Sequence, residues 1–161
     1  MEERLKEVKD SIGAIHNYPK PGIIFRDITP LLQNHDASKS CIDAFKLRYE
    51  MAGVTQIAAI EARGFLFGSA LAYAMGCGVT LLRKPGKLPG NIVSQTYALE
   101  YGTDELQMHE NALTSNDKVL IIDDLLATGG TVLAADKLIR STGATVEEAA
   151  FVVSLPELGG E

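Results

Sequence analysis

The sequence predicts an α/β fold, a doubly wound and mainly parallel sheet flanked by helices. Two short apolar runs, at 57–60 and 79–82, enclose a stretch of small residues of helical length, which is the βαβ pattern of parallel strands. A third apolar run, at 119–123, leads through a glycine-containing turn into another helical stretch. The chain has 161 residues, of which 46% are apolar and 22% charged, so it fits one compact domain over 1–161.

The N-terminal part of the chain is helical in pattern. Apolar residues at steps of three and four predict an amphipathic helix over 2–15, which the Pro- and Gly-rich stretch at 18–22 ends. A second helix is predicted over 38–52, with Asp36 or Ser38 as its cap. We expect residues 1 to about 34 to form a small N-terminal hood on the domain.

Beyond the second helix, strands and helices alternate. The run RKPGKLPG at 83–90 is predicted to be a loop, because it contains two prolines and two glycines. Residues from about 84 to 110 are expected to leave the sheet as an excursion with a flexible loop. The remaining predicted elements are a helix over 65–75, exposed strands over 92–99 and 104–110, a helix over 131–141 and a strand over 149–155.

Charge and cysteine content narrow the classes of function. With 15 Lys and Arg against 21 Asp and Glu, the formal net charge of −6 argues against bulk binding of nucleic acid. Cys41 and Cys77 lie in no CxxC motif, which favours reduced thiols in a cytoplasmic protein. The N-terminus is charged, and no apolar run approaches the roughly 20 residues of a membrane span. We therefore expect a cytoplasmic protein with no nucleic-acid or membrane partner.

The most informative segment is VLIIDDLLATGGT at 119–131. Ligands of open α/β sheets bind at the carboxyl ends of strands, and the N–H groups at a helix N-terminus suit a phosphate. No Lys follows the glycines as in a Walker A loop, and the chain contains no GxGxxG. Asp123 and Asp124 would repel a phosphate but could accept hydrogen bonds from ribose hydroxyls. Strand alternation should point the two apart, and a plain acidic turn is the simpler alternative.

This string resembles the signature for phosphoribosyl pyrophosphate (PRPP) in the type I phosphoribosyltransferases. The resemblance implies that Asp123 and Asp124 hold the ribose hydroxyls of PRPP. It also implies Mg²⁺ held mainly by PRPP itself, and a homodimer. The 5′-phosphate is then bound by a loop that consists of Ala127, Thr128, Gly129, Gly130 and Thr131.

Other segments resemble the members of this family that accept adenine. Ala127 stands where hypoxanthine-guanine members carry an Asp. The further matches are PGIIFRDITPLL at 21–32 with the segment that frames adenine, EARGF at 61–65 with the pyrophosphate loop, RKPGKLPG at 83–90 with a basic loop, and YALEYGTDEL at 97–106 with a mobile catalytic loop.

The resemblance also implies a role for each side chain. Arg63 binds pyrophosphate and is catalytic, and its planar fork suits phosphate oxygens better than a Lys does. Glu100 handles the proton of the purine, and Tyr101 helps the loop to close. Arg83, Lys84 and Lys87 bind pyrophosphate, while Ile24, Phe25, Arg26 and Leu158 bind adenine, with Phe25 and Leu158 stacking on its two faces. From the residues alone, Phe25 would be core, Arg63 the exposed start of a helix, and Glu100 and Lys87 solvated.

Together these features imply a pentosyltransferase of purine salvage that moves 5-phosphoribose from PRPP to adenine, forming AMP and pyrophosphate. Two alternatives stay open. The first is a transferase that accepts hypoxanthine, guanine or xanthine in place of adenine. The second is a PRPP sensor, which binds PRPP and releases no pyrophosphate. An unrelated nucleotide-binding α/β domain would rest on the fold alone.

Overall fold

The structure is a computed structural model that describes residues 2–99 and 102–161. The chain divides into two compact units, Met1–Leu47 and Arg48–Glu161, and the division falls within the last turn of helix α3 (His35–Tyr49). The boundary at 47 lies beyond the end of the expected hood near 34. The assignment of one domain to 1–161 stays a prediction.

The first unit contains a β-hairpin where the sequence predicted helix. Helix α1 (Glu2–Asp10) stops short of residue 15, because the chain turns at Gly13 into strand β1 (Gly13–His16). This strand pairs antiparallel with β2 (Ile24–Asp27). The helical spacing of apolar residues extends past α1 although these residues form a strand, so the predicted helix over 2–15 was wrong beyond Asp10.

Two helices follow the hairpin. Helix α2 (Thr29–Gln33), which the sequence analysis missed, has a proline in its first turn. Helix α3 begins at His35 rather than Ser38 and ends at Tyr49. Its cap is Asn34, whose Oδ1 accepts the backbone N–H groups of Asp36 and Ala37, both at 3.1 Å. The proposed caps Asp36 and Ser38 were wrong by a few residues.

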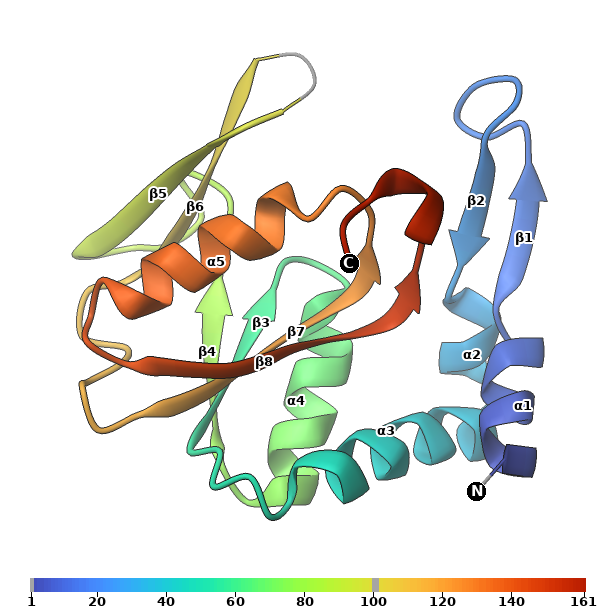
Figure 1. Cartoon of the computed structure of the whole chain (residues 1–161), viewed down its shortest axis with the longest axis horizontal. Coiled ribbons are helices and arrows are strands. Elements are labelled where there is room, and N and C mark those ends of the chain that lie inside the picture. The colour runs from blue at the N-terminus through green and yellow to red at the C-terminus, as the bar shows by residue number, and fades with distance from the viewer. Residues whose placement is uncertain (1, 100–101) are drawn as a thin grey trace. The chain divides into compact units, whose positions relative to one another are not determined.

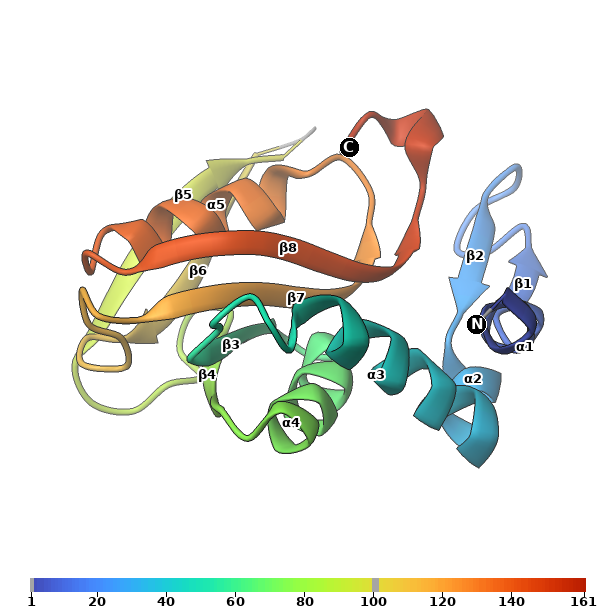
Figure 2. The same ribbon diagram turned by 60° about the horizontal axis from the view of Figure 1, so that its bottom comes forward.

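The second unit is built on a four-stranded sheet with the order β4-β3-β7-β8 (Figure 1). All three pairings are parallel, between β4 (Gly78–Leu82), β3 (Gln56–Ile60), β7 (Lys118–Leu126) and β8 (Thr145–Ser154). Figure 2 shows helix α4 (Gly64–Met75) on one face of the sheet and helix α5 (Gly130–Arg140) on the other. The predicted doubly wound parallel sheet is confirmed.

The strand order reverses between β3 and β7. The chain leaves β3 through α4 toward the edge strand β4, and it leaves β7 through α5 toward the opposite edge, β8. The carboxyl ends of β3 and β7 therefore open into loops that diverge, which is the point where open α/β sheets bind ligands. EARGF follows β3 directly, whereas DDLLATGGT begins in the last four residues of β7 and continues through the next loop into the start of α5.

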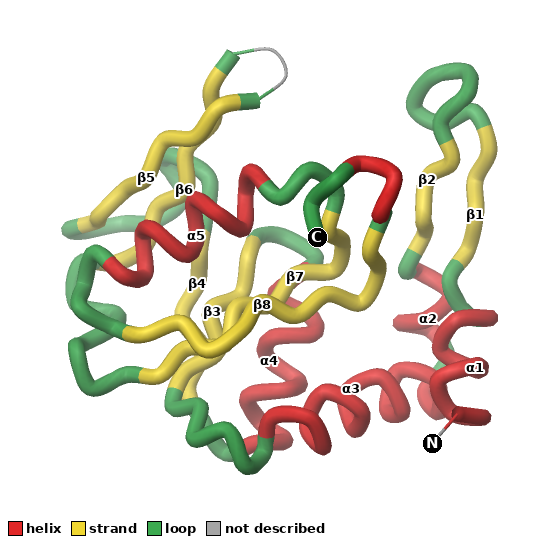
Figure 3. Tube along the Cα trace, in the orientation of Figure 1, coloured by secondary structure: helices red, strands yellow, loops and turns green. Residues whose placement is uncertain are grey.

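The predicted excursion is an antiparallel hairpin of β5 (Ile92–Ala98) and β6 (Thr103–His109) (Figure 3). The expectation that both strands are exposed was wrong for β6, since Leu106 and Met108 are fully buried. A bridge between Arg83 and Gln107 connects β6 to the chain just after β4. A short 3₁₀ turn (Pro156–Leu158) follows β8.

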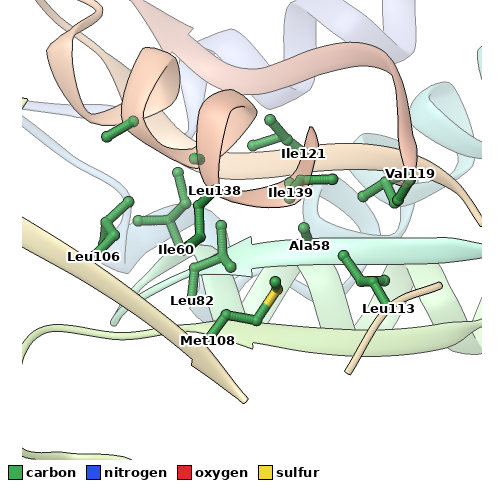
Figure 4. Close-up of a cluster of buried hydrophobic side chains, with 13 residues drawn as sticks. Ala58, Ile60, Leu82, Leu106, Met108, Leu113, Val119, Ile121, Leu138 and Ile139 are labelled. Atoms are coloured by element: carbon green, nitrogen blue, oxygen red, sulfur yellow. The ribbon is translucent and has the colours of Figure 1, made fainter. Parts of the chain in front are cut away.

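One buried cluster joins the sheet, helix α5 and the hairpin (Figure 4). In β7, Val119 and Ile121 belong to this cluster, whereas Leu120 and Ile122 are buried outside it, as expected for a strand covered on both faces. On the other face, helix α4 approaches closely at Gly68, where a Cβ would lie 2.6 Å from that of Ala59. The packing thus sets both helices, and the loops before them, against the ends of β3 and β7. Within 2–99 and 102–161, each helix is too short or too polar to span a membrane.

Candidate active site

The phosphate loop, residues 127–131, connects β7 to helix α5 and lines a pocket of about 90 Å³. Gly129 caps the helix with φ 84°, a left-handed conformation that side chains with a Cβ rarely adopt. The first turn of α5 therefore presents its unpaired backbone N–H groups beside the loop. Asp123 and Ile60 also line the pocket, so the structure brings the loop and the first acid together.

The turn at 159–160 packs directly on the phosphate loop. A Cβ on Gly160 would lie 2.3 Å from the carbonyl oxygen of Ala127 and 3.0 Å from the backbone nitrogen of Gly129. Only a glycine fits at this distance without a backbone shift. The sequence analysis missed this contact, and the paired glycines at 159–160 were its only local signal.

Asp123 is a partly buried acid that lines this pocket. Its Oδ1 accepts the backbone N–H of Asp124 at 2.8 Å. Burial raises its pKa well above the ordinary 3.8, with the charge of Asp124 adding to the rise and the N–H bond opposing it. Gly64, at the start of α4, leaves room for this carboxylate, since a Cβ there would lie 2.9 Å from Oδ1.

Asp124 has a different partner. Its side chain is 7% exposed, and its Oδ2 lies 2.8 Å from the Nε of Arg63, an ion pair without the alignment of a hydrogen bond. Arg63 stands just before helix α4, at the carboxyl end of β3, and 43% of its side chain is exposed. The pair therefore joins the loop after β3 to strand β7.

The cations of the basic loop, residues 83–90, are each paired with an acid. Arg83 and Lys87 contact Glu61, at 3.0 Å and 2.5 Å. Lys84 contacts Asp104 of β6, and its Nζ donates to the hydroxyl of Tyr97 at 2.6 Å. Burial lowers the pKa of Lys84, but the bonds to Asp104 and Tyr97 outweigh it and raise that pKa overall.

Comparison with known proteins places this geometry in a family. A family model of the phosphoribosyl transferase domain matches residues 27–159. The adenine phosphoribosyltransferase of Idiomarina loihiensis is 74% identical over 161 residues, which cover all of this chain and 91% of that protein. The chain belongs to the adenine phosphoribosyltransferases.

Solved structures agree with this assignment to the phosphoribosyltransferase family. The adenine phosphoribosyltransferase of Thermoanaerobacter pseudethanolicus superposes with a TM-score of 0.93 at 47% identity, covering 97% of this chain and 91% of that one. The Saccharomyces cerevisiae enzyme, complexed with adenine and an imino-altritol bisphosphate, gives 0.95 at 39% identity over 99% and 93%. The family and fold predicted from the sequence are both confirmed.

The segment predicted to be a mobile catalytic loop, 97–106, overlaps the end of β5 and the start of β6. Glu100 and Tyr101 lie outside the described residues, so their roles stay predictions. Tyr97, near the end of β5, contacts both the basic loop and the phosphate loop. Its hydroxyl accepts a hydrogen bond from Lys84 and lies 3.4 Å from the Oγ1 of Thr131. Sequence reasoning missed Tyr97, Asp104 and Glu61, because a tyrosine or acid beside a motif carries no signal of its partner.

The residues predicted to bind adenine fall in different units. Phe25 is half-buried in the hairpin of the first unit and meets the ring of Tyr18 edge-to-face, with centroids 5.3 Å apart. Ile24 and Arg26 flank it in β2 and are exposed. Leu158 belongs to the second unit and is 48% exposed. Stacking of adenine between Phe25 and Leu158 stays a prediction.

Metal ligands do not gather in the part of the chain that the structure describes. There, no group of three or more His, Cys, Asp or Glu side chains is arranged to hold an ion. Asp123 and Asp124 are neighbours, but one faces the pocket and the other faces Arg63. Binding of Mg²⁺ mainly by PRPP stays a prediction.

Proposed function

We propose that this chain transfers 5-phosphoribose from PRPP to adenine, forming AMP and pyrophosphate in purine salvage. The observation that supports it best is the pocket that the phosphate loop and Asp123 form at the strand-order reversal. Arg63 stands at the neighbouring strand end, paired with Asp124. A phosphate, a ribose and a second phosphate group would meet residues suited to each within this one edge of the sheet.

The phosphate loop holds the 5′-phosphate through backbone N–H groups and the hydroxyls of Thr128 and Thr131. The N-terminus of α5 adds a positive dipole end. Asp123 accepts ribose hydroxyls, and Asp124 accepts them or acts through Arg63. A ribose donor approaching Asp123 would favour its ionised form, offsetting the burial that now raises its pKa.

Departure of pyrophosphate leaves an oxocarbenium-like ribose and concentrates negative charge on the leaving group. Arg63, Arg83, Lys84 and Lys87 supply the positive charge that stabilises it. Mg²⁺ would be bound mainly by the oxygens of PRPP and would neutralise phosphate charge there. Glu100 manages the purine proton, and Tyr101 closes the loop so that water cannot hydrolyse PRPP.

The base is read by the first unit in this proposal. The backbone of Ile24 to Arg26 offers the complement of the adenine amine donor and its adjacent ring-nitrogen acceptor. Hypoxanthine reverses both groups, so each would face a like partner, and such sites can reject a mispaired base by about 10⁴–10⁵. Phe25 and Leu158 stack on either purine and do not discriminate.

Two further features belong to the proposal. The protein acts as a homodimer, as the family resemblance implies, and light scattering of the purified chain would measure this. It acts in the cytoplasm, in keeping with the free thiols of Cys41 and Cys77.

The decisive experiment measures pyrophosphate release from PRPP and Mg²⁺ with adenine, hypoxanthine or guanine. We expect release with adenine, and a kcat/KM for the other bases lower by about 10⁴ or more. Activity on hypoxanthine or guanine within about tenfold of adenine would overturn the choice of base. PRPP binding without release for any base would indicate a sensor. Phe25→Ala is the control, because it should weaken both purines and leave their ratio unchanged.

A further inference from the structure

Glu61 is a buried acid at the end of β3, where the pyrophosphate loop begins. Its side chain is only 5% exposed. Arg83 Nε donates to Oε2 at 3.0 Å, Lys87 Nζ donates to Oε1 at 2.5 Å, and the backbone N–H of Lys84 also donates to the carboxylate. Donors from residues 83–87 therefore converge on one carboxylate that lies more than twenty residues away in the chain.

The charge of Glu61 is kept by these contacts. Burial raises its pKa, but the hydrogen bonds from Lys87, the Lys84 N–H and Arg83 outweigh the burial and lower that pKa overall. An ionised carboxylate so enclosed needs its partners, because a buried charge left unpaired is strongly destabilising. Glu61 therefore fixes where the two cations lie.

Both cations keep part of their side chains exposed to solvent. Arg83 points Nε to Glu61 and Nη1 to the carbonyl oxygen of Lys87 at 3.3 Å, with Cζ 5.7 Å from the ring of Phe65. The side chain of Arg83 is still 31% exposed and that of Lys87 50%. With two cations against one acid, the group keeps a net positive charge that faces solvent.

We propose that Glu61 is a positioning residue for pyrophosphate, holding Arg83 and Lys87 in the orientation in which they receive the leaving group of PRPP. This inference rests on the proposed function and adds to it a residue that touches no substrate. Preorganised cations stabilise developing charge better than mobile ones, because their side chains lose no freedom when the ligand arrives. Without Glu61, each flexible side chain would lose rotamer freedom when pyrophosphate binds.

The test is Glu61→Gln, which keeps the size of the side chain and removes its charge. Calorimetry would measure binding of pyrophosphate with Mg²⁺ and, separately, of AMP. Loss of the charge-assisted bonds to Glu61 should lower pyrophosphate affinity by roughly tenfold to a hundredfold. AMP affinity should change little, because AMP carries the 5′-phosphate, ribose and base but no pyrophosphate. KM for PRPP should rise more than KM for adenine.

Glu148→Gln is the matched control, since Glu148 accepts two bonds from Arg48, at 3.1 Å and 2.7 Å, and belongs to β8. It should leave pyrophosphate binding unchanged. Glu61→Asp keeps the charge on a shorter side chain and should therefore retain part of the pyrophosphate affinity that Glu61→Gln loses. If Glu61→Gln does not fold, Glu61→Asp still allows the same measurement.

Two results would overturn the inference: unchanged pyrophosphate affinity in Glu61→Gln, or an equal loss of AMP and pyrophosphate affinity, which indicates general damage. Wild type that binds pyrophosphate but transfers no phosphoribose would instead count against the proposed function.

Discussion

The phosphate loop and the basic loop are both suited to phosphate groups, yet they are built in opposite ways. Residues 127–131 contain no cation, and they offer glycine backbone, two threonine hydroxyls and the start of α5. Residues 83–90 offer three cations, each paired with an acid on another segment. The phosphate loop thus offers fixed backbone dipoles, whereas the basic loop offers charged side chains that are held by acids.

The difference follows from what each site has to do in the proposed reaction. The 5′-phosphate is the same in PRPP and AMP, so its site only has to hold it, and rigid N–H groups suffice. Pyrophosphate gains negative charge as it leaves, so its site must interact more strongly with the transition state than with the substrate. Charged side chains provide that increase.

Neither loop handles a proton, so the largest single effect is expected outside both. Glu100→Gln should lower kcat by about 10²-fold or more, since general acid–base groups contribute about 10²–10⁴-fold. Binding of PRPP should stay nearly intact. Single-turnover kinetics would measure the chemical step itself, and a rate within about threefold of wild type would remove Glu100 from the proton-handling role.

Substitution of one glycine in the phosphate loop and one in the basic loop tests the difference between the two loops. Gly129 and Gly86 have similar φ values, 84° and 78°, but a Cβ on Gly129 meets Gly160 at 3.2 Å whereas one on Gly86 meets open space. Both alanine variants carry strain of about 1–2 kcal/mol. Gly129→Ala should also misdirect the N–H groups and weaken PRPP binding by roughly 10²-fold. Gly86→Ala should weaken it much less, and equal losses in a PRPP titration would contradict the proposed difference.

Asp123 and Asp124, the two acids predicted to bind ribose, should respond differently to loss of charge. Asp123→Asn and Asp124→Asn should each raise the Kd for PRPP by roughly tenfold to a hundredfold, more than for adenine. Asp124→Asn should in addition weaken pyrophosphate binding, because it removes the ion pair of 2.8 Å between Asp124 and Arg63. Calorimetric titrations with PRPP and pyrophosphate would separate the two. Unchanged PRPP affinity in both variants would remove the ribose assignment.

The smallest expected effect is on stability, and it has a defined pH dependence. The pKa of Asp123 is raised in the folded protein, so the folded state binds this proton more tightly and loses stability as pH rises from 3.8 toward the raised value. Asp123→Asn removes that loss, and Tm at neutral pH should rise by a few degrees, at roughly 2–4 °C per kcal/mol. At pH below 4 the difference in Tm from wild type should vanish. A Tm that falls at neutral pH would show that the carboxylate stabilises the fold.

The second unit was more predictable from its sequence than the first. The strands at 57–60, 79–82 and 119–123 are short, bounded by turn residues and apolar except for Thr80 and Asp123, so a local pattern was enough to predict a doubly wound sheet. In the first unit, Ile15 continued the helical spacing of α1 and yet pairs with Phe25 in a hairpin. Periodicity alone could not reveal that partner.

The sequence by itself determined the sheet, the loop between β7 and α5 and the family, because each depends on residues that are neighbours in the chain. Only the tertiary structure decided that Asp123 faces the pocket while Asp124 pairs with Arg63. It also decided that Glu61 holds two cations of a distant loop, and that Gly160 packs on Ala127. Parallel strands bring loops from distant positions to one edge of the sheet. At that edge, the role of a charged side chain or of a glycine depends on partners that are distant in the chain, and a local sequence pattern does not identify them.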